Sequence, residues 1–178
     1  MSRADATIGT VIFFFLAPAL VAGVVPRWIS GWHIEPPFFE WMLFRYIGGI
    51  LLLAGVLGVL DSFARFAIEG RGTPATIAPT ESLVVTGLYR YVRNPMYVCV
   101  VSAVLGQALL FGNLTLLIYG LMVWLLFHLF VLIYEEPTLR RNFGKQYVVY
   151  CNAVPRWIPR VKSRRWARVR ALTDRGLR

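Results

Sequence analysis

Two short polar segments beside long apolar runs carry the residue types that could do chemistry. The first, Gly87–Tyr97, combines tyrosines, an asparagine and two arginines just before an apolar run. The second is the pair Glu135–Glu136, at the end of another apolar run. Charged and polar groups at a membrane boundary are costly unless a partner or a ligand satisfies them. Together the two segments therefore predict a site at a membrane surface.

The glutamates favour a cationic ligand, because a partly buried carboxylate needs an opposite charge such as an ammonium or sulfonium group. On an uninterrupted helix, His128 and Glu135 share a face and would point into one cleft. Pro137 opposes this arrangement, because it predicts a break near Glu136. A lone histidine such as His128 is more often a satisfied interior residue than a catalyst, and a structural ion pair is the alternative explanation for the glutamates. Candidate partners for such a pair are Arg90, Arg93 and Arg140.

The dipeptide Asn94–Pro95 is typical of a helix start, with asparagine as the N-cap and proline in the first turn. Capping alone would explain Asn94. The free amides of a helix N-terminus also attract anions. A ligand that carries both a carboxylate and a cationic centre could bridge this helix start and Glu135. An amino-acid-like cofactor has that charge pattern.

Four apolar runs must position these residues, at about 7–25, 41–60, 95–111 and 114–134. Each run is near the ~20 residues that span a bilayer as a helix. Only 16% of the residues are charged and 57% are hydrophobic, whereas soluble domains average about 25% charged. The sequence predicts an all-α integral membrane protein with about four transmembrane helices. The short Gly112–Asn113 connection predicts an antiparallel pair of helices.

Charge predicts the orientation of these helices. The net charge is +10, and twelve of the nineteen Lys and Arg residues lie from Arg140 onward. Basic segments beside membrane helices mark the cytoplasmic side and attract anionic lipid. We therefore expect both termini and the site to be cytoplasmic, the tail 161–178 to bind anionic membrane lipids, and no nucleic acid to bind. The two cysteines, Cys99 and Cys151, lack the spacing of a zinc site, and no metal is predicted.

Beyond the last apolar run, apolar residues recur at Leu139, Phe143, Tyr147 and Tyr150. The spacings of four, four and three predict an amphipathic helix. We expect it to lie on the cytoplasmic membrane surface and to complete a cofactor pocket. Residues 1–160 are thus predicted to form a single membrane domain, followed by the basic tail.

The two polar segments also carry a family resemblance. The pattern Leu-Val-x-x-Gly-x-Tyr-x-x-x-Arg-Asn-Pro-x-Tyr spans residues 83–97, and Glu-Glu-x-x-Leu-x-x-x-Phe-Gly-x-x-Tyr-x-x-Tyr spans 135–150. With the closing Arg-Trp-Ile-Pro at 156–159, these blocks resemble the isoprenylcysteine carboxyl methyltransferase and phospholipid methyltransferase family of integral membrane enzymes. The resemblance covers about residues 81–159. The first two apolar runs carry no signature of the family.

The resemblance implies S-adenosylmethionine as the methyl donor and a lipophilic carboxylate or amine, in a small molecule or a lipid, as the acceptor. A carboxylate acceptor needs no base, whereas an amine must lose a proton. Glu136 and His128 are the candidate catalytic residues for that proton. The cofactor-binding residues that the resemblance implies are Glu81, Ser82, Leu83, Val84, Tyr89, Asn94, Pro95, Met96, Tyr97 and Glu135.

Two positions depart from the prenylcysteine enzymes that the chain resembles. Asn94 stands where those enzymes usually have histidine, and Val131 stands where they carry an arginine thought to meet the substrate carboxylate. The departures argue against carboxyl methylation of a prenylated cysteine as the specific reaction. Two other functions remain as alternatives: an NADPH-dependent membrane reductase of the sterol-reductase type, which shares a related block, and a non-catalytic membrane scaffold.

The orientation can be tested with reporter fusions. A fusion at residue 112 and a fusion at the C-terminus should report opposite sides of the membrane, because one predicted helix separates them. Signals from the same side would contradict the four-helix arrangement.

Overall fold

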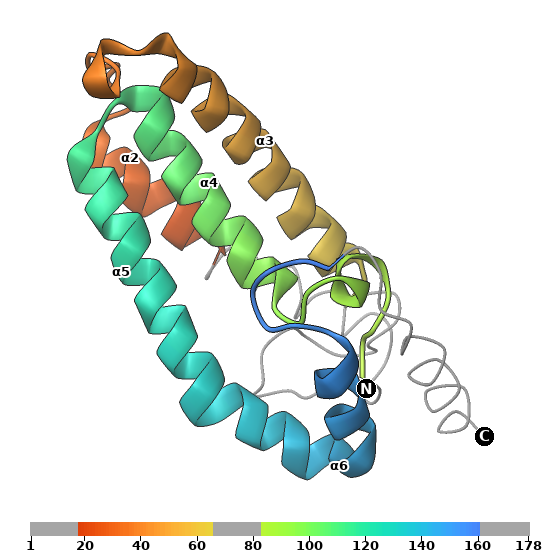
Figure 1. The fold of residues 1–178 in the computed structure, drawn as a ribbon. Coiled ribbons are helices and arrows are strands. Elements are labelled where there is room, and N and C mark those ends of the chain that lie inside the picture. The colour runs from red at the N-terminus through yellow and green to blue at the C-terminus, as the bar shows by residue number, and fades with distance from the viewer. Residues whose placement is uncertain (1–17, 66–82, 161–178) are drawn as a thin grey trace. The chain divides into compact units, whose positions relative to one another are not determined.

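The computed structural model describes residues 18–65 and 83–160, and every regular element in these ranges is helical (Figure 1). The described residues divide into two compact units. The first, here called the helical unit, contains residues 18–60 and 96–128. The second, here called the motif unit, contains residues 61–65, 83–95 and 129–160. The predicted basic tail at 161–178 lies outside the described residues.

The predicted apolar helices are present within the described residues, with shifted ends, and the predicted first run begins at residue 7, outside them. The third prediction matches its helix, whereas the second helix runs five residues further than predicted and the first continues to Ser30. The fourth α-helix ends at Phe130 and continues as a π-helix. The elements are a π-helix Leu20–Val24, α2 Val25–Ser30, a 3-10 turn Phe38–Glu40, α3 Met42–Arg65, α4 Pro95–Phe111 and α5 Leu114–Phe130.

Pro26 explains why the first described helix changes its hydrogen bonding near residue 24. Proline has no N–H, so the carbonyl of Ala22 loses the partner that a regular α-helix would supply. Gln107 of α4 donates its amide to that carbonyl at 2.7 Å, and the Tyr119 hydroxyl of α5 donates to the carbonyl of Val21 at 3.0 Å. Gln107 and Tyr119 thus satisfy backbone groups that an apolar environment would leave unpaired.

Close packing of α3 against α4 depends on small residues. A Cβ added at Gly48 would lie 2.5 Å from the backbone nitrogen of Leu110 and 2.7 Å from the carbonyl oxygen of Gly106. Gly106 faces the backbone of α3 in the same way. The two helices run side by side in Figure 1. Gly48 therefore lets α4 approach closely, while Gly49 faces open space.

Apolar surface remains exposed on the outer faces of α3 and α5. Two helical stretches, Met42–Arg65 and Leu114–Ala153, are long and apolar enough to cross a membrane, and only 22% of each apolar window is buried. Soluble monomers rarely expose contiguous apolar surface on this scale. The helices Leu20–Ser30 and Pro95–Phe111 are shorter. By length and composition the described helices support a membrane protein, and the number of spans stays a prediction.

The motif unit contains the predicted amphipathic helix. A π-helix, Val131–Glu135, leads into α6, Glu136–Ala153, and a 3-10 turn, Gly87–Arg90, belongs to the same unit. The helix does not end at Pro137. Glu135 and Glu136 keep helical backbone angles, so α6 continues directly from the π-helix, and Pro137 lies in its first turn. α6 does kink at Gly144, whose φ of 50° and ψ of −123° are not helical.

The apolar face of α6 packs on the protein itself. Tyr147 and Tyr150 are buried with Val85, Ala153 and Val154 in one hydrophobic cluster. The predicted helical face is confirmed, and part of it is covered by residues that precede α4. Its position on a membrane surface stays a prediction.

Adjacent glycines of α3 offer a matched test of the close packing. We expect Gly48→Ala to destabilise the protein by about 1–3 kcal/mol, because the new methyl group meets backbone atoms that cannot turn aside. Gly49→Ala should leave stability unchanged or raise it by up to ~1 kcal/mol, through helix propensity. Thermal unfolding in detergent, followed by circular dichroism, compares the two variants. Equal midpoints would contradict the α3–α4 contact.

Candidate functional site

The first polar segment is anchored by a glycine and an arginine. Gly87 has a φ of +53°, a conformation that L side chains rarely adopt, and a Cβ there would collide with the side chain of Arg65. Arg65 pairs with Asp61 at 3.2 Å and donates to the Thr86 hydroxyl at 3.3 Å. The end of α3 therefore holds the start of the Gly87–Arg90 turn, and a larger residue at position 87 would not fit.

A buried tyrosine ties the first polar segment to α6. The Tyr150 hydroxyl donates a hydrogen bond of 2.7 Å to the carbonyl oxygen of Tyr89. Both side chains are buried. Burial raises the pKa of the Tyr150 phenol well above its ordinary value. The phenol therefore stays protonated across the physiological range and remains a donor, which fixes the turn against the helix.

The centre of the motif unit is a cluster of two arginines and one glutamate. Glu136 Oε1 accepts hydrogen bonds from Arg93 Nη1 at 3.0 Å and from Arg156 Nε at 2.6 Å, and Oε2 accepts from Arg156 Nη2 at 2.9 Å. Arg156 thus makes a two-pronged contact, the geometry that best matches a guanidinium to a carboxylate. The side chains of Arg93 and Glu136 are only 12% and 14% exposed. This is a largely desolvated ionic cluster with one positive charge in excess.

Arg93 has further contacts within the cluster. Its Nη1 also lies 2.9 Å from the sulfur of Cys151. Its Nε is buried and has no hydrogen-bond partner in the structure. A buried guanidinium N–H without a partner costs free energy unless another group completes it. The cluster is therefore chemically able to accept an anionic group. The hydrogen bonds from Arg156 to Glu136 raise the pKa of Arg156, so its charge persists at all relevant pH values.

The residues after α6 run alongside the residues that precede α4. The backbone N–H of Arg93 donates to the carbonyl of Pro155 at 2.9 Å, and the N–H of Arg160 donates to the carbonyl of Tyr91 at 3.1 Å. The Asn94 side-chain amide donates to the carbonyl of Arg156 at 3.2 Å. These three bonds fasten the segment 154–160, here called the C-terminal strap, to residues 91–94.

The structure brings most of the predicted site residues into the motif unit. Asn94 is buried, and α4 begins at Pro95, as predicted for the helix start. The predicted residues in this unit are Leu83, Val84, Tyr89, Asn94, Pro95, Glu135 and Glu136. Met96, Tyr97 and His128 belong to the helical unit. Glu81 and Ser82 lie outside the described residues.

In the helical unit the predicted site residues take part in ring contacts. Tyr97 lies against Phe127, with ring centroids 4.7 Å apart, and His128 stacks on Trp124 at 5.4 Å. The predicted common face of His128 and Glu135 assumed an uninterrupted α-helix. That assumption is wrong, because the π-helix between residues 131 and 135 changes the number of residues per turn. The catalytic role of His128 stays a prediction.

Arg156 was not among the predicted site residues. It lies between Pro155 and Pro159, outside any periodic pattern, and twenty residues from its partner Glu136. Helical spacing rules reach only three or four residues. The available signal was compositional: an arginine inside the short family-like block at 156–159. Of the three ion-pair partners predicted for Glu136, Arg93 is the one that the described contacts confirm.

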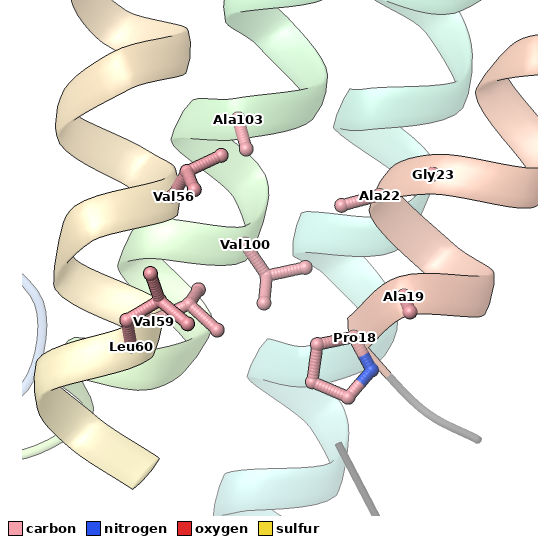
Figure 2. A pocket seen from close by; sticks show the side chains of 9 residues that line it. All are labelled: Pro18, Ala19, Ala22, Gly23, Val56, Val59, Leu60, Val100 and Ala103. Carbon is pink, nitrogen blue, oxygen red and sulfur yellow. The ribbon is translucent and has the colours of Figure 1, made fainter. Parts of the chain in front are cut away.

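A cavity of about 170 Å³ lies inside the helical unit. Figure 2 shows that its walls come from the first described helix, α3 and α4. The lining residues are Pro18, Ala19, Ala22, Gly23, Val56, Val59, Leu60, Val100 and Ala103. Since these side chains carry no polar group, the cavity does not suit a charged cofactor.

The exposed apolar helices are typical of a membrane protein. The ionic cluster includes Glu136, which follows directly after the π-helix that continues α5. Residues 43–146 match the model of the phospholipid methyltransferase family, and the chain belongs to this family. Over 78 residues it is 38% identical to a protein-S-isoprenylcysteine O-methyltransferase of Schizosaccharomyces pombe and 34% identical to protein-S-isoprenylcysteine O-methyltransferase B of Arabidopsis thaliana. Each match covers 43% of this chain, but only 33% and 39% of the two relatives.

The family match confirms the resemblance found in the two polar segments. It favours methyl transfer over the reductase and scaffold alternatives, because the family is defined by methyltransferases. The matched segment of 78 residues spans well under half the length of each curated relative.

The buried tyrosine contact gives a test of the motif unit. Tyr150→Phe removes the hydroxyl and leaves the carbonyl of Tyr89 without this donor, so we expect a loss of about 1–3 kcal/mol in stability. Tyr91→Phe is the matched control, because this substitution removes the same hydroxyl group from a tyrosine that is exposed. Thermal unfolding midpoints in detergent compare the variants. Equal shifts in both would show that the Tyr150–Tyr89 bond does not hold the segment.

Proposed function

We propose that the protein is an integral membrane methyltransferase that uses S-adenosylmethionine and acts on a lipophilic carboxylate or amine. One observation carries the proposal. In a chain of the phospholipid methyltransferase family, the motif unit packs the Gly87–Asn94 segment against the helix that begins at Glu136. These are the two blocks that the family resemblance marks as halves of one cofactor pocket.

We further propose that the chain crosses the membrane four times, with both termini and the motif unit on the cytoplasmic side. Basic residues concentrate before α4 and after α5, and the short turn at Gly112–Asn113 carries no charge. A soluble cofactor would then reach the site from the cytoplasm, while a lipophilic acceptor would reach it from the bilayer. The basic tail would contribute contacts to anionic lipid.

The residues of the motif unit suit the charges of the proposed cofactor. Its methionine part carries an ammonium and a carboxylate, and its sulfur is a sulfonium. Glu135 offers a carboxylate for a cationic centre. The unpartnered Nε of Arg93 and the positive excess of its cluster offer complementary charge for a carboxylate. Both signs of charge are therefore available within one unit, as a zwitterionic ligand requires.

The main task of the protein in methyl transfer is to align the methyl donor with the acceptor atom. When bound, S-adenosylmethionine supplies an electrophilic methyl group: a bond forms from the acceptor oxygen or nitrogen to the methyl carbon as the carbon–sulfur bond breaks. The residues of the motif unit would hold the reacting groups in line and exclude water. A carboxylate acceptor needs no further help. For an amine, Glu136 and His128 remain the candidate bases, and Glu136 would first have to release a guanidinium.

The two relatives and the residue at position 131 both bear on the chemical nature of the acceptor. Both relatives are named as O-methyltransferases of isoprenylcysteine, which supports a lipophilic carboxylate. Position 131 is a fully buried valine here, where the prenylcysteine enzymes that the chain resembles carry an arginine. A carboxylate acceptor would therefore need another cationic partner. The proposal accordingly extends to carboxylates and amines alike.

Cofactor binding tests the proposed function directly. Isothermal titration of the purified protein with S-adenosylhomocysteine should give saturable binding, and titration with NADPH should not. Glu135→Gln should weaken the binding of S-adenosylhomocysteine about tenfold or more, the value of a lost charged hydrogen bond.

The matched control is Glu40→Gln, which makes the same charge change at an exposed residue of the helical unit. We expect its affinity to equal that of the unaltered protein. Binding of NADPH in place of S-adenosylhomocysteine would support the reductase instead. If neither ligand binds, or if Glu135→Gln and Glu40→Gln behave alike, the proposed cofactor site is wrong.

A further inference from the structure

We propose that Arg156 is a positioning residue of the cofactor site, an inference that rests on the proposed methyltransferase function. Its guanidinium holds the Glu136 carboxylate at two points, at 2.6 and 2.9 Å. The same carboxylate holds Arg93 at 3.0 Å. Arg156 acts through Glu136 on Arg93, and through Arg93 on the residues that precede α4.

Backbone groups also connect the residues that precede α4 with the C-terminal strap. Arg93 donates its N–H to Pro155, and Asn94 donates its side-chain amide to Arg156 itself. Arg156 is therefore the point where the C-terminal strap is joined to both family blocks. Its side chain reaches α6, and its carbonyl reaches the start of α4. A change at this side chain should shift Asn94, a predicted cofactor residue, without removing any predicted cofactor contact.

Loss of the Arg156–Glu136 ion pair should have a larger effect on the site than loss of an ordinary surface ion pair. Exposed ion pairs contribute little, because solvent screens them and the side chains lose entropy. Arg156 is 32% exposed, but its partner Glu136 is only 14% exposed and is shared with the still more buried Arg93. Networks and two-pronged geometry are the cases in which such pairs matter. Without Arg156, the Oε2 atom of Glu136 loses the donor Nη2 and the C-terminal strap loses its side-chain anchor.

The test compares cofactor affinity and kinetics in Arg156→Ala and Arg156→Lys. A misplacement of about 1 Å far from the chemistry can cost up to ~100-fold. We expect Arg156→Ala to weaken S-adenosylhomocysteine binding and raise the KM for the methyl donor by about tenfold or more, with a smaller change in kcat. Arg156→Lys should restore only part of the affinity, because an ammonium cannot reproduce the two-pronged contact.

Two controls separate positioning from general destabilisation. Arg141→Ala removes the same charge from an exposed position of α6 and should leave the affinity unchanged. Gly48→Ala is expected to lower stability through the α3–α4 contact, which involves no residue of the cluster. If Arg156→Ala binds S-adenosylhomocysteine as tightly as the unaltered protein, or no more weakly than Gly48→Ala at a matched fraction of folded protein, the positioning role is wrong.

A double-mutant cycle completes the test. Glu136→Gln and Arg156→Ala should weaken binding by less together than the product of their separate effects, because both break the same link. Independent effects would overturn the inference. If the unaltered protein itself binds no S-adenosylhomocysteine, the proposed function fails first, and the positioning role fails with it. If it binds but Arg156→Ala is silent, only the positioning role fails.

Discussion

One carboxylate shared by two guanidiniums constrains the motif unit more than any other interaction in it. Glu136 opens α6, Arg93 precedes α4, and Arg156 follows the end of α6. Taking a single carboxylate out of water beside apolar helices is costly, and so is leaving a guanidinium there alone. The three segments must therefore converge for any of these charges to be tolerated. The Tyr150–Tyr89 hydrogen bond and the contacts of the C-terminal strap then orient these three segments, which the charges already hold together.

The helical unit handles polar groups in the opposite way. Between its ends, polar side chains serve the backbone: Gln107 donates to Ala22, which Pro26 has deprived of its helical partner. At the turn between α4 and α5, Asn113 donates to the Glu35 carboxylate at 2.7 Å and accepts from the N–H of Leu116. No charge is left to apolar surroundings along these described helices. The helical unit thus suits an apolar environment, whereas the motif unit holds a cluster of charged side chains.

The sequence allowed the helices to be predicted because apolar runs and turn residues are local signals. The helix start at Asn94–Pro95, the Gly112–Asn113 turn and the apolar face of α6 follow from spacing alone. The π-helix at residues 131–135 was missed, because no apolar period distinguishes one extra residue in a turn. Arg156 was missed for a different reason: its partner is a long-range one, and a segment between prolines has no periodic face. Local sequence patterns therefore predicted the helices and turns, whereas the pairing of Arg156 with Glu136 became evident only from the folded structure.

Val131 marks a difference between this chain and the prenylcysteine enzymes that it resembles. It is fully buried within the π-helix, so an arginine there would need its own satisfied environment. This chain has instead an apolar side chain at that position, and in the described charge cluster the Glu136 carboxylate already accepts hydrogen bonds from Arg93 and Arg156. If the two family-like blocks hold the methyl donor, as proposed, selection of the acceptor would rest on residues outside those blocks, and Val131 is one of them.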